Sequence, residues 1–251
     1  MVQRNDLLAY CNQLLQPQLF KDYGPNGLQV EGRAEVRNVV SGVTASRAFI
    51  QAAIEQGADT LLVHHGLFWR GHDGSVTGWL KQRLALLLAH DINLLAYHLP
   101  LDAHPQWGNN AQLGAHMGWQ TTGTFGDQSL GMLGHPAQGE TDATSLTRAL
   151  QSQLGTTPVA VVPNPQRAIR RIAWCTGGAQ SWFESAIAAG ADAFVTGEIS
   201  EPQAHLAQET GVAFFACGHH ATERYGAPAL AAHVCEHLGL AHQFIDIHNP
   251  A

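Results

Sequence analysis

Apolar and polar positions along the chain alternate in blocks that predict helices and strands in turn. A first helix is predicted after Asn5-Asp6, because apolar residues recur there at helical spacing through residue 15. A turn cluster at 23–27 precedes a short strand at 28–30 and a core strand at 36–43. Thr44 or Ser46 caps the next helix, Gly57 ends it, and a strand follows at 58–63. This pattern is a β-α-β unit.

The same alternation continues through the middle of the chain. A glycine-rich loop at 71–77 leads to a helix at 78–90 and a buried strand at 92–97. Pro100 then turns the chain, which brings His98 and Asp102 close together. Asn109-Asn110 caps a helix to about residue 117, and residues 121–141 are expected to be a loop-rich boundary. A helix at 142–154 and a strand at 158–162 follow.

The pattern of the first half returns in the second. Residues 36–65 match 169–198 at a constant offset, and both copies contain Gly-Ala-Asp before the second strand. With one residue of slippage, 92–102 parallels 212–223, and both end in His-x-x-x-carboxylate. We therefore predict an α/β fold with two similar halves related by internal duplication, 1–125 and 126–251, whose polar strand ends face each other. The C-terminal segment either stays with the second half or packs back on the first.

Composition limits the class of protein. Hydrophobic residues make up 45% of the 251 residues, which is typical of a globular chain, but charged residues only 13%, against about 25% in ordinary soluble domains. Two explanations are open for the shortage of charged residues. Part of the surface is buried in a homo-oligomer, or the many Ala, Gln and Gly residues reflect a bias in the genome's composition. A net charge of −7 argues against binding to duplex nucleic acid and leaves single nucleotides open. Four cysteines without CxxC spacing, no signal peptide and no membrane span point to a soluble cytoplasmic protein.

The chain contains fifteen histidines, a large number for a chain with so few charged residues. We therefore searched the sequence for metal ligands. His64 and His65 end a predicted strand, where neighbouring side chains point to opposite sides and suit two different partners. His219 and Glu223 are four apart and share a face of a predicted helix. With Asp102 they form a set of three imidazoles and two carboxylates, which suits two divalent ions of Fe, Mn, Zn, Co or Ni with one carboxylate bridging.

Other polar residues lie near these positions. Glu198 stands in the second copy where the first has its histidine pair, so Glu198 and His98 are the candidate acid and base residues. The alternative for His98, and the assignment of His104 and His220, is a place in the surroundings of the site or in the fold. Thr176-Gly177-Gly178 lies between a strand and a helix, where backbone N–H groups either receive a phosphate or simply make a turn.

These residues together resemble the GTP cyclohydrolase 1 type 2 homolog family, also called the NIF-three-like family, in its short bacterial form. The resemblance covers the whole chain and rests on these segments: YGPNGLQVEG (23–32), GVTAS (42–46), VHHGLFW (63–69), HLPLDAHPQWGNN (98–110), AWCTGGAQS (173–181), VTGEISE (195–201), GHHATERY (218–225) and FIDIHNPA (244–251). It implies a toroidal homohexamer with an interior di-metal site. His65 and Asp102 would bind one ion, His64 and His219 the other, and Glu223 would bridge them.

Two classes of function compete. The first is a metal-dependent hydrolase of a nucleotide or similar small molecule, acting either as a cyclohydrolase or as a phosphoesterase. The second is a non-catalytic metal-binding ring that binds a partner protein. Five side chains for two ions leave coordination positions open for water and substrate, which favours chemistry.

Overall fold

The computed structural model describes all residues from 1 to 251, and the chain folds into two compact units. The first unit contains residues 1–108 and 226–248, and the second contains 109–225 and 249–251. The chain therefore passes between the units at residues 108/109, 225/226 and 248/249. The sequence pattern placed the boundary at residue 125 and left open whether the C-terminal segment returns to the first half. The physical reason is packing, because the helix after residue 108 joins the core of the second unit and the long helix after 225 joins that of the first.

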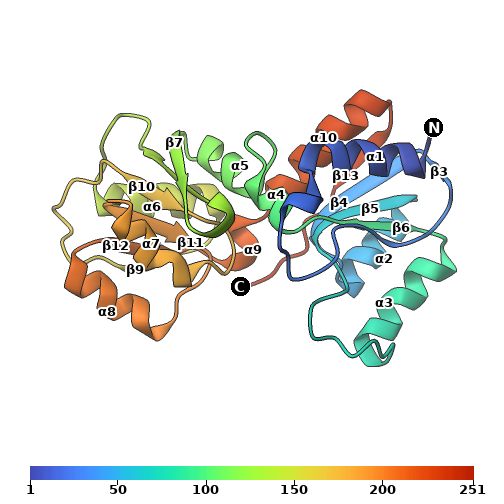
Figure 1. The fold of residues 1–251 in the computed structure, drawn as a ribbon, viewed down its shortest axis with the longest axis horizontal. Helices are drawn as coiled ribbons and strands as arrows, with labels where there is room; N and C mark the ends of the chain where they lie inside the picture. The colour runs from blue at the N-terminus through green and yellow to red at the C-terminus, as the bar shows by residue number, and fades with distance from the viewer. The chain divides into compact units, whose positions relative to one another are not determined.

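The first unit is built on a five-stranded mixed sheet (Figure 1). In spatial order its strands are β13 (Ala241–Phe244), β4 (Asn38–Thr44), β5 (Thr60–His65), β6 (Asn93–Ala96) and β2 (Gly27–Val30). The first four run parallel, and β2 is antiparallel to β6 at the edge. The pairing of β13 with β4 means that the C-terminal segment packs back on the first half.

Helices cover both faces of this sheet, as Figure 1 shows. They are α1 (Arg4–Leu15), α2 (Arg47–Glu55), α3 (Gly78–Ala89), α4 (Leu99–Ala103) and α10 (Gly226–Leu238), with a short 3-10 turn at Pro17–Leu19 and a small ribbon of β1 (Val2–Gln3) and β3 (Glu35–Val36). Leu61 and Val63 of β5 pack under α2 and α3, whereas Leu62 packs under α1 and α10. Successive side chains of β5 thus enter opposite cores, as alternation along a strand requires.

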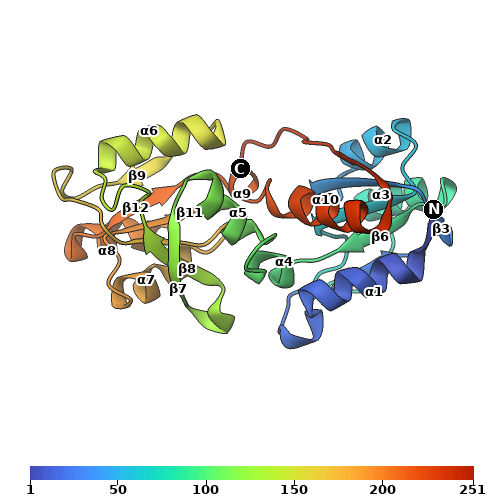
Figure 2. The same ribbon diagram turned by 90° about the horizontal axis from the view of Figure 1, so that it is seen from above.

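The second unit is built on a six-stranded mixed sheet. In spatial order its strands are β7 (Gln120–Phe125), β8 (Gly131–His135), β10 (Ile172–Trp174), β11 (Ala193–Thr196), β12 (Ala213–Ala216) and β9 (Val159–Val161). Its helices are α5 (Asn109–His116), α6 (Ala143–Leu154), α7 (Phe183–Ala188), α8 (Glu201–Thr210) and α9 (His219–Thr222), with 3-10 turns at Asp127–Ser129 and Gln180–Trp182. Helix α6 lies on one face of this sheet, and α7 and α8 lie on the other (Figure 2).

The expectation of a loop-rich segment at 121–141 is wrong. Most of it forms an antiparallel hairpin, β7 with β8, and β8 also pairs with β10. Gly131 and Gly134 gave the segment a loop-like composition, but they lie where the chain has no room for a Cβ, against the ring of Phe125 and the backbone of Gln120. Ladder hydrogen bonds to a neighbouring strand override weak local preference.

The two units share one local arrangement. In the first, Asp59 accepts hydrogen bonds from the backbone N–H groups of Arg37 and Asn38 at 2.8 and 3.0 Å and from the Arg33 guanidinium at 2.9 Å. In the second, Asp192 accepts from the backbone of residues 170 and 171, both at 3.0 Å, and from the guanidinium of Arg167 at 2.9 Å. The aspartate of each Gly-Ala-Asp sequence therefore links the starts of two neighbouring strands by the same hydrogen bonds, β4 and β5 in the first unit and β10 and β11 in the second.

None of the helices reaches the length and apolar character that crossing a lipid bilayer requires.

Candidate metal centre

Strand β5 delivers His64 and His65 at its carboxyl end. The apolar run 61–63 is fully buried between the two helical layers, and the two imidazoles follow it directly. His64 is completely buried and His65 is half-buried, and their ring centroids lie 4.5 Å apart. The sequence placed these two side chains correctly at the end of a strand.

Both imidazoles are held through Nδ1. His64 Nδ1 lies 3.0 Å from the carbonyl oxygen of Tyr97, which can only accept, so His64 carries its proton on Nδ1. His65 Nδ1 lies 3.2 Å from the Thr44 hydroxyl. In each ring this leaves Nε2 as the nitrogen suited to a metal ion, the arrangement found around most histidine ligands.

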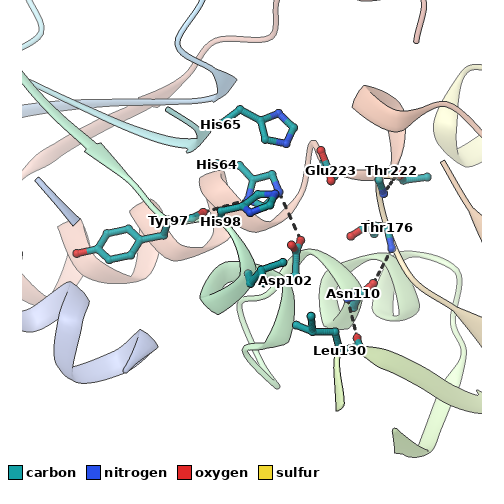
Figure 3. Close-up of polar contacts among 12 residues, drawn as sticks. His64, His65, Tyr97, His98, Asp102, Asn110, Leu130, Thr176, Thr222 and Glu223 are labelled. Carbon is teal, nitrogen blue, oxygen red and sulfur yellow. Dashed lines mark hydrogen bonds and ion pairs between the residues drawn. The ribbon is translucent and has the colours of Figure 1, made fainter. Parts of the chain in front are cut away.

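Asp102 approaches the same place from α4. The helix begins after His98 with Pro100 in its first turn, and the backbone N–H of Asp102 donates to the His98 carbonyl at 3.1 Å. The carboxylate is 7% exposed, and its Oδ1 lies 3.5 Å from His64 Nε2. Figure 3 shows His64 and Asp102 directed toward each other, with His65 and His98 beside them.

His98 completes a cluster of imidazoles in the first unit. Its ring centroid lies 5.0 Å from that of His64 and 5.6 Å from that of His65. A ring nitrogen of each of these three residues lies within 4.8 Å of the other two. This spacing, together with burial, is suited to holding a divalent cation.

The second unit contributes His219 and Glu223. As their spacing predicted, they lie one turn apart on α9 and its C-cap, and His219 Nε2 is 3.2 Å from Glu223 Oε2. His219 Nδ1 lies 2.6 Å from the carboxylate of Glu198. Burial lowers the pKa of His219, but the hydrogen bonds and charges of Glu223 and Glu198 raise it to about 9. Glu198 thus binds the side of His219 that faces away from Glu223.

Residues 176–178 form a tight turn against this pair. Gly177 has φ +68°, and a Cβ there would overlap the carboxylate of Glu223 and lie 3.1 Å from His219 Nε2. The backbone N–H of Gly177 donates to the Thr222 hydroxyl at 3.0 Å, and that hydroxyl is directed at the carbonyls of Gly218 and His219, at the start of α9, at 3.0 and 2.9 Å. Gly177 is therefore required by its close approach to the candidate ligands, and its backbone N–H is already engaged, whereas a Cβ at Gly178 would make only ordinary contacts.

Asn110 is a supporting residue that no pattern in the sequence gives a reason to select. We expected it to cap a helix, but its buried amide donates to the Leu130 carbonyl at 3.0 Å and accepts from the backbone N–H of Thr176 at 2.8 Å (Figure 3). The backbone carbonyl of Asn110 accepts from the indole N–H of Trp174 at 2.8 Å. Asn110 therefore fixes the turn that packs against Glu223.

The two remaining histidine candidates have structural contacts. His104 Nδ1 accepts from the backbone N–H groups of Gln106 and Trp107 at 3.2 and 3.0 Å, and its ring stacks on the Trp107 indole. His220 is buried, and its backbone N–H donates to the carbonyl of Ala251 at 3.0 Å. Both contacts organise backbone around the neighbouring ligand candidates.

The donor set in each unit fits first-row divalent metals. Imidazole nitrogen and carboxylate oxygen together are ligands for Zn, Fe, Mn, Co or Ni, whereas Ca and Mg favour oxygen alone. The buried position of Asp102 and the short His219–Glu223 contact are consistent with side chains arranged around a cation.

Comparison with known proteins places the chain among described relatives. Residues 2–250 match the model of the family Duf34/NIF3 (NGG1p interacting factor 3). A protein of Neisseria meningitidis serogroup A / serotype 4A, named GTP cyclohydrolase 1 type 2 homolog, is 55% identical over 251 residues, covering the whole of both chains.

Two solved structures are also similar over the full length of both chains. One is a protein called ybgI, described as of unknown function, which is 44% identical and superposes with a TM-score of 0.95. The other is TTHA1606 from Thermus thermophilus, which is 33% identical with a TM-score of 0.90. These likenesses extend over both units of the chain.

Proposed function

The chain belongs to the Duf34/NIF3 family, and on that premise we propose that it is a hydrolase using two divalent metal ions held by His64, His65, Asp102, His219 and Glu223. Relatives at 45–55% identity carry the name GTP cyclohydrolase 1 type 2 homolog. We take from that name a substrate class, a purine nucleotide, and a reaction type, hydrolysis.

One observation carries the proposal. The Nδ1 atoms of His64, His65 and His219 are engaged by the Tyr97 carbonyl, the Thr44 hydroxyl and the Glu198 carboxylate respectively. In two of these residues Nε2 lies 3.2–3.5 Å from a carboxylate of the same unit. Partners of this kind orient a histidine and raise its basicity as a ligand.

The proposed division of ligands follows the family resemblance. His65 and Asp102 bind one ion, His64 and His219 bind the other, and Glu223 bridges the two. The mixed nitrogen and oxygen donors favour Fe, Mn, Zn, Co or Ni. Because the ligands come from both units, we infer that a fragment of either unit alone binds metal weakly.

The ions would supply a water molecule of lowered pKa and would polarise the group under attack. The chain's own residues would do the rest. His98 lies beside His64 and His65, where it can exchange a proton with substrate or water. Glu198 has an exposed fraction of 44%, and Gln180 donates to its second oxygen at 3.2 Å. We propose that Glu198 orients His219 and contacts substrate through this exposed side.

We also propose that the two halves arose by duplication and that the chain assembles as a homohexamer. The matching contacts of Asp59 and Asp192 support the first proposal. Three large apolar side chains around the start and end of α3 support assembly: Val76, Trp79 and Leu88 are 49%, 54% and 63% exposed. Large apolar side chains left exposed are available for contact with another protein chain.

The test is hydrolysis of GTP by metal-loaded protein. Formate release and loss of guanine absorbance are measured after loading with Mn, Fe, Zn, Co or Ni in turn. Glu223→Gln removes the proposed bridging carboxylate, and Glu209→Gln on the exposed side of α8 is the matched control. We expect turnover with at least one metal in the wild type and the control, and none in Glu223→Gln. Full metal occupancy without turnover would favour the non-catalytic ring instead.

A further inference from the structure

The turn at residues 22–26 has a conspicuous sequence and no part in the proposed ligand set. Its first residue, Asp22, has a side chain only 4% exposed. Four donors converge on that carboxylate: the backbone N–H of Tyr23 at 2.6 Å, His98 Nδ1 at 2.7 Å, Asn26 Nδ2 at 2.8 Å and the backbone N–H of Leu99 at 2.9 Å. A carboxylate has about four acceptor sites, so Asp22 is fully satisfied as an anion.

The charge state of Asp22 agrees with this geometry. Burial would raise its pKa, but the hydrogen bonds from His98 and Asn26 hold it below the ordinary value for an aspartate. An ionised carboxylate can only accept hydrogen bonds. The shared proton between Asp22 and His98 therefore lies on His98 Nδ1.

Asn26 strengthens the same contact from the other end of the turn. Its Oδ1 accepts from the backbone N–H of His98 at 2.7 Å while its Nδ2 donates to Asp22. Asp22 and Asn26 together thus bind the backbone of residues 98 and 99 and the imidazole of His98. The ring is further confined by the edge of Trp69, whose centroid lies 5.0 Å away at an interplanar angle of 87°.

An imidazole fixed by Nδ1–H has one nitrogen left to accept a hydrogen bond, Nε2. His98 lies within the cluster formed with His64 and His65. His98 differs from those two residues in its partner, because a buried carboxylate binds its Nδ1 where they have a carbonyl and a hydroxyl. A histidine held by a buried aspartate is the arrangement that enzymes use to keep one tautomer in place.

We propose that Asp22 is a positioning residue, which fixes His98 in the Nδ1–H tautomer so that His98 Nε2 accepts the hydrogen bond of the attacking water beside His64 and His65. This proposal rests on the proposed function for its reaction, but the assignment of the tautomer stands on the contacts of Asp22 alone. In this arrangement Asp22 does not touch substrate and acts only through His98.

The substitution Asp22→Asn tests it, because the amide keeps the volume but has one oxygen for four donors. The matched control is Asp59→Asn, at the opposite end of β5. Asp59 is also buried and also accepts three hydrogen bonds from arginine and backbone groups, but it has no contact with His98. Each variant is compared with the wild type in thermal unfolding, in metal content and in turnover of GTP.

We expect both variants to fold with lower unfolding temperatures and to bind as much metal as the wild type. Asp22→Asn should lower kcat about 10- to 100-fold with little change in KM, as loss of an orienting partner does at comparable sites. Asp59→Asn should keep its kcat. The double variant Asp22→Asn/His98→Gln should be no slower than His98→Gln, because Asp22 acts through His98.

A spectroscopic measurement decides the tautomer without any turnover. Long-range ¹H–¹⁵N correlation of the zinc-loaded protein should show His98 protonated at Nδ1 in the wild type and as a tautomer mixture in Asp22→Asn. A wild-type His98 protonated at Nε2, or equal kcat losses in Asp22→Asn and Asp59→Asn, would overturn the proposal. So would loss of metal from Asp22→Asn, since His98 would then be a ligand. If GTP is not hydrolysed, the proposed function fails, while the spectrum still confirms or overturns the role of Asp22.

Discussion

Glu198 Oε1 lies 2.6 Å from Nδ1 of His219, the shortest of the contacts that orient a candidate ligand imidazole. Because Glu198 is 44% exposed, water can replace part of this contact when the carboxylate is removed. The carboxylate still holds the Nδ1 side of the His219 ring in place. Its effect should therefore be seen in metal affinity before it is seen in stability.

We predict that Glu198→Gln weakens metal binding about 10- to 100-fold, since an amide orients the imidazole less strongly than a carboxylate does. Affinity is measured by competition with a chelator. The control is Glu201→Gln, which alters an exposed Glu–His pair of similar length, 2.8 Å to His205, on α8. Unchanged affinity with a large loss of turnover would assign Glu198 to the substrate alone.

Glu223→Ala should lose most of the bound metal and remain folded. Each unit has its own hydrophobic cores, so the fold does not depend on the ions. Metal content and thermal unfolding are compared with those of metal-free wild type and of Glu209→Ala. The unfolding temperature should match that of the metal-free wild type, because bound ligand is what raises it. An insoluble Glu223→Ala protein would mean that the metals are structural.

Gly177→Ala should abolish metal binding through a clash with Glu223. The new Cβ would overlap the Glu223 carboxylate and displace it. Gly155→Ala is the matched control, because Gly155 has a similar φ of +72° but nothing within 4 Å of a Cβ. Both variants should lose about 1–2 kcal/mol from the left-handed backbone conformation, measured by denaturant unfolding. Only Gly177→Ala should lose metal, and equal metal content in the two would contradict the close approach.

The pairing of β13 with β4 should weaken on mild acidification. His242 Nε2 lies 2.8 Å from the Ser41 hydroxyl, and burial lowers the pKa of His242 below its ordinary value of 6.5. As the pH falls, His242 therefore takes up a proton at a higher pH in the unfolded chain than in the folded chain. The stabilisation is full above pH 6.5 and is lost as the pH falls from there through the lower pKa of the folded state.

The free energy of unfolding, measured in urea between about pH 8 and pH 5, should therefore fall less steeply in His242→Gln than in the wild type. His205→Gln, which changes an exposed histidine of α8, is the control and should retain the wild-type slope. Parallel curves for the wild type and His242→Gln would show that His242 ionises alike in both states.

Light scattering should give about six times the mass of one chain, as the proposed hexamer requires. Replacing Trp79 or Leu88 with Asp should lower that mass if the exposed side of α3 forms the contact. The exposed surface position Glu209, changed to Gln, should leave the mass unchanged. A monomeric wild type would contradict the hexamer and leave genomic bias as the explanation for the low content of charged residues.

Local patterns in the sequence were enough to predict many elements and the position of the candidate ligands within them. The apolar run 61–63 identifies a buried strand, so His64 and His65 had to stand at its end. Of the two expected caps, Thr44 and Ser46, the structure has Ser46, whose side chain accepts from the backbone N–H of residue 49. The four-residue spacing of His219 and Glu223 likewise places them together on one turn. Each of these properties depends only on neighbours within a few positions, because the helical and strand periods are local.

Tertiary structure alone decided which distant groups hold those side chains. Asp22 meets His98 across 76 positions of sequence and Asn110 meets Thr176 across 66, and no periodicity marks either pair. Local patterns left the return of the C-terminal segment to the first unit open, and they missed the hairpin of β7 and β8. Hydrogen bonds of this kind depend on which segments the packed core brings side by side. Which segments lie side by side depends on how all the apolar segments of the chain are buried together. A short stretch of sequence contains information about only one of those segments.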